Sequence, residues 1–291
     1  MKMRLKAWWD GNLLEVRSKG SDGQSGDGAT TNPRTTQLDK VALIQAIWGD
    51  GMTGPGDKDY IANLVKPMGL DPSMTILDLG AGLGGPTRIM AEHFGPWVNG
   101  LELDKDFAEA GMALSEKAGL AKKASVAVVD LDKHEFRPGA VDGVLSKELL
   151  FKIKDKEALI KKIAVHLKDR GRLLMTDYIR PAGVSEDDIA EWIAADPEDP
   201  EIWTSEQYEA AFNQNNMDLR IHEDVTQEHI DLVTGAWQRI MTSPLCKKLN
   251  PETGAELVKM GEFWQGRLRE LEKGNLILVR YFALKRVNLE S

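Results

Sequence analysis

The chain has 291 residues, of which 42% are hydrophobic and 29% charged, and its formal net charge is -9. This length fits one large α/β domain with an elaborated lid, or two modest domains. The negative charge argues against a nucleic-acid partner, which normally requires a basic face. The single cysteine, Cys246, excludes an internal disulfide and fits a reducing, cytoplasmic location.

Residues 1–17 open with three cations beside Trp8 and Trp9, but Asp10 interrupts any signal-peptide core. This segment could touch a membrane surface peripherally or pack on the protein's own lid, and we favour the second. Residues 18–35 are rich in Gly and Ser and are predicted to form a flexible linker. No apolar run approaches a length that spans a bilayer.

The following segment alternates between helical and strand patterns. A helix is predicted from Thr36 to Trp48, a glycine-dense loop over residues 49–56, and a second helix over residues 57–68. Strands are predicted at Thr75–Leu79, Trp97–Leu103, Ser125–Val129, Val141–Ser146 and Gly171–Tyr178. Helices are predicted between most of them, at Gly85–His93, Phe107–Ala118 and Lys156–Leu167. This alternation predicts a doubly wound, parallel sheet.

From residue 181 the pattern changes to helices with acidic turns and no clear strand, which predicts a helical lid over the carboxyl edge of the sheet. The run Gly274–Lys285 is β-rich and predicts a last strand. The expected organisation is therefore a cofactor-binding core over residues 36–180, a lid or substrate region over residues 181–273, and a return to the core over residues 274–291.

A glycine-rich turn follows the first predicted strand. Gly80, Gly82, Gly84 and Gly85 lie just after Asp78, and a helix comes next. Glycines there let the backbone approach a ligand closely, and the helix N-terminus offers free N–H groups. The spacing Gly80-x-Gly82-x-x-Gly85 also satisfies the dinucleotide fingerprint, so it leaves the cofactor class open.

Three acids at successive strand ends favour adenosylmethionine. Asp78 would repel a pyrophosphate, whereas a sulfonium and an ammonium group would be attracted to it. Glu102 lies about twenty residues after the turn, where a ribose-binding carboxylate is expected. Asp130 ends the third strand and could reach the adenine edge.

At these residues the chain resembles the class I methyltransferases, and most closely the phosphoethanolamine N-methyltransferase and sarcosine/dimethylglycine methyltransferase type. Four stretches carry the resemblance: residues 47–56, 77–85, 146–156 and 173–178. It implies a Rossmann-like, mostly parallel, seven-stranded sheet with N-terminal helices and a helical lid insertion. It also implies S-adenosyl-L-methionine as cofactor. The implied cofactor contacts are Trp48, Met52, Thr53, Asp78, Gly80, Ala81, Gly82, Glu102, Leu103, Asp130, Leu131, Ser146 and Lys147.

The substrate side departs from this family. Residues 47–56 resemble the lid loop of this family, which covers the cofactor. The family has a Tyr before this loop and a His after the fourth strand, and these positions fall at about Ile44 and on Lys152 here. Neither residue preserves the proton chemistry, since Ile44 is apolar and lysine is a poor base at neutral pH. The phosphate-binding Arg and Tyr cluster has no clear counterpart, and an acidic turn at residues 196–201 would repel a phosphomonoester. Phosphoethanolamine is therefore not expected as the substrate.

Acceptor-site candidates lie at the same carboxyl edge. Glu148, Lys152 and Tyr178 are the predicted catalytic residues, although Lys152 reads equally well as a solvated residue at a helix start. One or two of four lid tryptophans are expected to line the pocket. These four are Trp192, Trp203, Trp237 and Trp264. The five histidines are scattered and predict no metal site.

The leading hypothesis is methyl transfer by in-line displacement to a small-molecule acceptor, an amine or a lipid- or metabolite-borne nucleophile. A second is C-, S- or O-methylation of a hydrophobic or lipid acceptor, motivated by Ile44 and the tryptophan-rich lid. An NAD(P)-binding oxidoreductase and a non-catalytic cofactor binder remain open alternatives. The expected partners are a small-molecule or lipid-linked substrate and further copies of the chain in a homo-oligomer.

Overall fold

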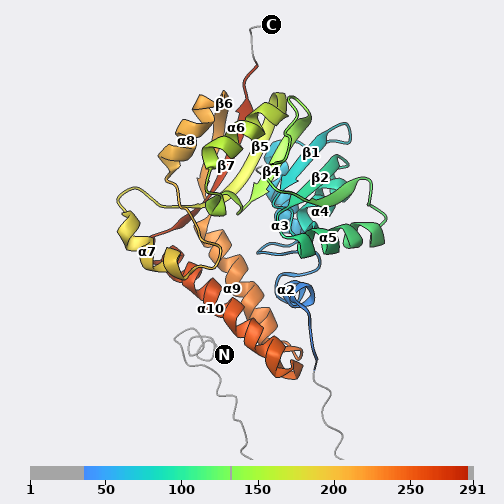
Figure 1. Ribbon diagram of the computed structural model, residues 1–291, viewed down its shortest axis with the longest axis vertical. Helices are drawn as coiled ribbons and strands as arrows, with labels where there is room; N and C mark the ends of the chain where they lie inside the picture. The colour runs from blue at the N-terminus through green and yellow to red at the C-terminus, as the bar shows by residue number, and fades with distance from the viewer. Residues whose placement is uncertain (1–35, 132, 288–291) are drawn as a thin grey trace, which may run out of the picture.

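The computed structural model describes residues 36–131 and 133–287. Its centre is a seven-stranded sheet with the strand order β3-β2-β1-β4-β5-β7-β6 (Figure 1). The strands are β1 (Thr75–Leu79), β2 (Trp97–Glu102), β3 (Ala124–Val128), β4 (Val141–Lys147), β5 (Leu167–Ile179), β6 (Met217–Asp224) and β7 (Ile277–Lys285). Strands β1 to β5 run parallel, and β7 pairs antiparallel with both β5 and β6. The expected doubly wound, mostly parallel sheet is confirmed.

Most of the helices begin next to a residue whose side chain caps them. The α-helices are α2 (Lys40–Trp48), α3 (Lys58–Leu64), α4 (Gly85–His93), α5 (Lys105–Lys117), α6 (Lys156–His166), α7 (Glu186–Ala195), α8 (Ser205–Gln214), α9 (Thr226–Thr242) and α10 (Pro251–Lys273). Helix α2 starts later than predicted because the Asp39 carboxylate accepts a hydrogen bond from the Ala42 N–H at 2.7 Å. Helix α3 ends early, and a 3-10 turn with Pro67 at its start follows it.

The two faces of the sheet are each packed against a layer of apolar side chains. Neighbouring strand residues point to opposite faces, so Ile76 packs with α3, α4 and α5, whereas Leu77 packs with α6 and α8. The layer with Ile76 continues into α9 and α10, and it contains Trp237 and Trp264. The lid helices are therefore part of the same apolar core as the first half of the chain.

The prediction of a lid without strands is wrong at β6. Within this strand only Met217 is buried, and the remaining residues are partly or fully exposed at the sheet edge. A mostly polar edge strand lacks the buried apolar run by which the inner strands are recognised. The inserted region thus completes the sheet through β6, while α7, α9 and α10 lie beyond its carboxyl edge (Figure 1).

The predictions for residues 1–17 and 18–35 lie outside the described residues. Across the part of the chain that the structure describes, none of the helices is both long enough and apolar enough to cross a membrane.

Candidate functional site

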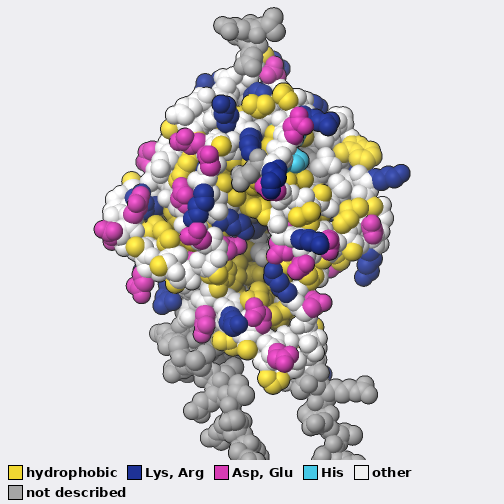
Figure 2. Space-filling model, viewed as in Figure 1, with side chains coloured by type: hydrophobic (Ala, Val, Ile, Leu, Met, Phe, Trp, Pro, Cys, Tyr) yellow, Lys and Arg dark blue, Asp and Glu magenta, His cyan; other side chains and the backbone are white. Residues whose placement is uncertain are grey.

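A large cavity lies at the carboxyl ends of β1, β2 and β4, beneath α2, α7 and α10. Its volume is about 1070 Å³, above the roughly 300–1,000 Å³ of a typical single-ligand pocket. Figure 2 shows a hollow in the middle of this face with hydrophobic side chains along it. In an open α/β sheet the crevice where the strand order reverses is the expected ligand site, and here it lies between β1 and β4. The cavity has room for a cofactor and an acceptor together.

The lid loop is seated on the glycine turn. Gly82 has a φ of +56°, and a Cβ built on it would lie 2.3 Å from the Thr53 Oγ1. A side chain there would be strained by its backbone and would collide with the loop. A Cβ on Gly80 would meet the Leu149 side chain at 3.2 Å. The glycines therefore let the lid loop and the segment after β4 close over the turn.

Glu102 holds the turn in shape. One carboxylate oxygen accepts a hydrogen bond from the Gly82 N–H at 2.6 Å. The other oxygen accepts from the N–H groups of Leu103 at 2.8 Å and Asp104 at 2.9 Å. The carboxylate at the end of β2 thus connects its own strand end to the glycine turn after β1.

Asp78 is a buried acid at the end of β1. Its carboxylate accepts a hydrogen bond from the Thr87 hydroxyl at 2.6 Å. Burial raises the pKa of Asp78 to about 6, although the Thr87 hydrogen bond opposes the rise. With Glu102 it gives the floor of the cavity two carboxyl groups beside the glycine turn.

Glu148 stands in a strained position just after β4. Its φ is +48°, a conformation that side chains rarely adopt and that is found at functional sites. Its carboxylate pairs with the Lys147 ammonium at 2.6 Å and accepts a hydrogen bond from the Thr176 hydroxyl at 3.1 Å. Burial alone would raise the pKa of Glu148, but the Lys147 ammonium and these hydrogen bonds bring it below its usual value. Glu148 is therefore ionised at neutral pH.

The far wall of the cavity carries a buried ion-pair network. The Arg267 guanidinium on α10 binds Asp196 at 3.0 Å and also pairs with Glu198. Lys152 binds the same Glu198 at 3.0 Å. The expected repulsion of anions by this acidic turn needs correction, because Arg267 and Lys152 neutralise its Asp196 and Glu198.

Most of the predicted site residues line the cavity. They are Trp48, Met52, Thr53, Asp78, Gly80, Ala81, Gly82, Glu102, Leu103, Lys147, Glu148 and Lys152. Ile44 lines it too, at the position where the resembling family has a Tyr. Of the four lid tryptophans, Trp192 and Trp264 line it.

The expectation that Tyr178 reaches the acceptor site needs correction. Its side chain is fully buried and does not line the cavity, because α9 covers this end of β5. The Tyr178 hydroxyl lies 2.7 Å from the His229 Nε2. Burial lowers the pKa of His229 to about 4, so its ring is neutral at physiological pH. The neighbouring Asp177 is also buried, and it accepts a hydrogen bond from the Tyr208 hydroxyl.

Three predicted cofactor contacts lie outside the cavity wall. Ser146 is fully buried in the inner strand β4. Asp130 forms an exposed ion pair with Lys133, and Leu131 packs at the edge of the apolar layer that contains α6. The roles proposed for these three residues stay predictions.

The sequence analysis does not identify Arg267, or the aromatic side chains around it, as part of the site. Four rings surround its guanidinium, the nearest being Phe263 at 4.2 Å and Phe151 at 4.7 Å. In sequence, one arginine in a long helix with many charges is indistinguishable from its solvated neighbours. Only the fold brings Asp196, 71 residues earlier, against it.

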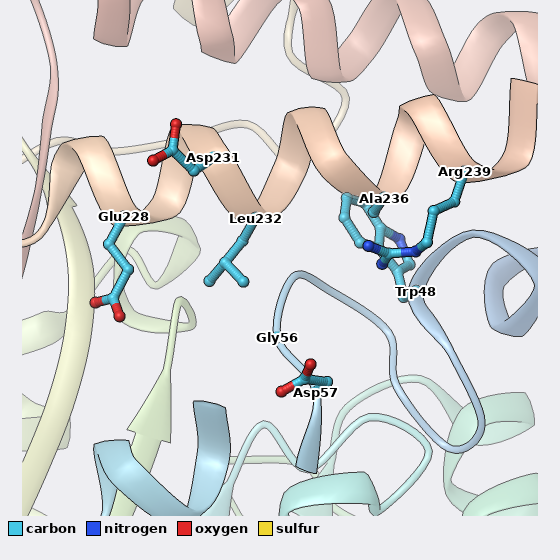
Figure 3. A pocket seen from close by; sticks show the side chains of 8 residues that line it. All are labelled: Trp48, Gly56, Asp57, Glu228, Asp231, Leu232, Ala236 and Arg239. Carbon is cyan, nitrogen blue, oxygen red and sulfur yellow. The ribbon is translucent and has the colours of Figure 1, made fainter. Parts of the chain in front are cut away.

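A second, smaller cavity of about 480 Å³ lies between α9 and the lid loop. In Figure 3, Trp48 lies beside Arg239 at one end of it, and Asp57 faces it from the loop. Trp48 borders both cavities and is the wall between them. Within residues 36–131 and 133–287, no three His, Cys, Asp or Glu side chains gather as metal ligands would.

A family model described as a methyltransferase domain matches residues 77–175. The matched residues contain the glycine turn, Glu102 and Glu148. Phosphoethanolamine N-methyltransferase 3 of Arabidopsis thaliana is 30% identical over 153 residues, which are 53% of this chain and 31% of that protein. The sterol 24-C-methyltransferase of Yarrowia lipolytica is 24% identical over 189 residues, 62% of this chain and 50% of that one. The chain thus spans about a third of the length of the first of these relatives.

Solved structures agree on the fold of this methyltransferase domain. Haemonchus contortus phosphoethanolamine N-methyltransferase 2, in complex with S-adenosyl-L-methionine, superposes with a TM-score of 0.75 at 23% identity. The match covers 84% of this chain and 56% of that one. A putative sarcosine dimethylglycine methyltransferase from Galdieria sulphuraria gives 0.66 at 18% identity, covering 80% and 85%. The expected resemblance to these methyltransferases and the expected seven-stranded fold are confirmed.

Proposed function

We propose that this protein transfers a methyl group from S-adenosylmethionine to a small-molecule acceptor. The observation that carries the proposal is the pair of carboxyl groups, Asp78 and Glu102, on either side of the glycine turn in the cavity floor. The same turn with two acids beside it disfavours a pyrophosphate and favours a cationic cofactor. The methyltransferase relatives agree with this reading.

The residues present fit this cofactor. Glu102 lies where a ribose can bind, Asp78 where positive charge is favoured, and Thr53 in the loop that covers the turn. The cofactor supplies an electrophilic methyl group. The methyl carbon gains a bond to the acceptor lone pair as the carbon–sulfur bond breaks, and S-adenosylhomocysteine leaves with the sulfur electron pair. The protein's task is to hold the two reactants in line and exclude water.

Glu148 is the proposed catalytic residue. Its ionised carboxylate lies in the cavity wall beside Lys147, so it can accept a hydrogen bond from an amine and favour the positive charge that forms on it. Lys152 lines the cavity as well, but its ammonium is held by Glu198. We assign Lys152 to fixing the acidic turn rather than to proton transfer.

The proposal is tested by binding and by turnover. S-adenosylmethionine and S-adenosylhomocysteine at 100 times their Kd should each stabilise the protein by about 2.7 kcal/mol. Labelled S-adenosylmethionine with fractionated metabolite and lipid extracts should then give a labelled product and S-adenosylhomocysteine. An unchanged thermal midpoint with both ligands, together with tight NADH binding, would instead favour the oxidoreductase alternative. Cofactor binding without turnover on any fraction would favour a non-catalytic binder.

The titration of Asp78 predicts that the preference of the site for S-adenosylmethionine over S-adenosylhomocysteine depends on pH. Because burial raises its pKa to about 6, Asp78 is neutral below that pH and anionic above it. The ratio of S-adenosylmethionine to S-adenosylhomocysteine affinity should rise about tenfold from pH 5 to pH 7.5, since an ion pair at effective ε of 20 contributes on the order of 1 kcal/mol or more. Calorimetric titrations across this range measure it.

The stability of the ligand-free protein should fall with rising pH, whereas the affinity ratio rises. The folded state holds a proton on Asp78 that the unfolded chain releases nearer pH 4, so stability falls as pH rises from about 4 to about 6. Asp78→Asn should remove both this contribution and the pH dependence of the affinity ratio. A ratio that still changes with pH in Asp78→Asn would assign the effect to another group.

A further inference from the structure

The far half of the cavity is lined by one apolar helix face. Met260, Phe263 and Trp264 lie on α10 at a spacing that brings them to one side of the helix. Trp192 of α7 and Ile44 of α2 complete the wall. Both tryptophans are more than nine-tenths buried, so this wall is fixed in place by packing. Along these residues a ligand would meet rings and a thioether. The exposed side chains of Glu256, Lys259, Glu262 and Arg269 on the same helix also line the cavity.

The cations Arg267 and Lys152 in this part of the cavity are both paired with carboxylates. The Arg267 guanidinium is engaged by two carboxylates and lies over the Phe263 ring at 4.2 Å. Lys152 is engaged by one of the same carboxylates, that of Glu198. An anionic group on a ligand would have to separate a buried ion pair, which costs several kcal/mol. The wall therefore selects against a phosphate or carboxylate at this end.

Polar groups able to bind a nucleophile come from another part of the lining, the segment after β4. Glu148 and Lys147 follow β4, and a Cβ on Gly54 of the lid loop would lie 3.9 Å from the Glu148 Oε2. The cavity thus combines charged, hydrogen-bonding groups near the lid loop with an apolar stripe of side chains on α10. Its volume of about 1070 Å³ leaves space for a sizeable body beside the cofactor.

We propose that the acceptor is an amphiphile, with a nucleophilic head at Glu148 and an uncharged apolar chain or ring system lying along Met260, Phe263 and Trp264 of α10. This inference rests on the proposed function and names the substrate class for the same site. An amphiphilic acceptor differs from a small zwitterion or a phosphomonoester, because most of its binding free energy comes from burying its apolar chain or ring system.

A series of alkylamines tests the proposal. The full chain is saturated with S-adenosylhomocysteine and then titrated calorimetrically with ethylamine, butylamine, hexylamine and octylamine. Affinity should rise about fourfold per added methylene, the equivalent of about 0.8 kcal/mol per buried CH₂. Phosphoethanolamine should bind no more tightly than ethylamine. An affinity independent of chain length, or phosphoethanolamine as the tightest ligand, would overturn the proposal.

Two variants on one helix provide a matched comparison. Met260→Ser should weaken octylamine binding about tenfold and leave ethylamine and S-adenosylhomocysteine binding unchanged, whereas Met260→Leu should keep the chain-length dependence. Val258 is 41% exposed on α10 and does not line the cavity, so Val258→Ser should change none of these affinities. Equal losses in Met260→Ser and Val258→Ser would refute the placement. Failure of S-adenosylhomocysteine itself to bind would count against the proposed function instead.

Discussion

Glu102→Ala should lower the affinity for S-adenosylhomocysteine about a hundredfold. The variant removes a buried carboxylate that accepts three backbone hydrogen bonds, one of them from Gly82 in the cofactor turn. A hydrogen bond to a charged group contributes about 1.5–3 kcal/mol, and each 1.4 kcal/mol is tenfold in affinity. The turn loses its anchor and the ribose loses its proposed partner in the same step. Calorimetry with S-adenosylhomocysteine measures the loss.

Two further variants separate this effect from a general loss of stability. Glu116 is an exposed acid on α5, and Glu116→Ala should leave both affinity and thermal midpoint unchanged. Glu102→Gln keeps one acceptor oxygen and should lose less affinity than Glu102→Ala. If Glu102→Ala binds as tightly as the unaltered protein, the carboxylate is not part of the cofactor site.

Arg267→Met should destabilise the folded protein by about 3–5 kcal/mol, the usual result of removing one partner from a buried ion pair. The change leaves the nearly inaccessible Asp196 carboxylate, with a side chain only 1% exposed, without its guanidinium. Glu198 retains Lys152, so the penalty falls mainly on Asp196. Urea unfolding at pH 7, compared at constant m-value, measures the difference.

The ion-pair explanation also predicts that a second substitution, at Asp196, restores stability. Adding Asp196→Asn to Arg267→Met should recover part of the lost stability, because the uncompensated charge is gone. Arg269→Met alters an exposed arginine two residues along the same helix, and it should change stability by less than about 0.5 kcal/mol. Equal effects at residues 267 and 269, or a double variant less stable than Arg267→Met, would contradict the assignment.

The sequence predicts the inner sheet well because parallel strands are buried on both faces. Thr75–Leu79 is a short, mostly apolar run with Asp78 as its penultimate residue, and the structure reproduces it to the residue. The edge strand β6 has no such run, since most of its side chains face solvent. Its pairing with β7 is fixed by a neighbour that lies some sixty residues later in the chain.

The part of the cavity that we propose for the cofactor was predictable for a related reason. Asp78, the glycine turn and Glu102 are placed by strand ends, which periodicity locates. Tyr178 also ends a strand, yet α9 packs against it and puts His229 on its hydroxyl. Which strand end stays open depends on where a helix fifty residues away comes to rest, and no local pattern contains that information.

The contact between the lid loop and the glycine turn has a consequence for how this sequence can vary. A Cβ at position 82 would overlap the Thr53 hydroxyl, so the two positions share one small volume. Any residue larger than glycine at 82 requires a smaller residue or a displaced loop at 53, and a bulkier residue at 53 is tolerated only while 82 remains glycine. Substitutions at these two positions are therefore conditional on each other, although 29 residues separate them along the chain.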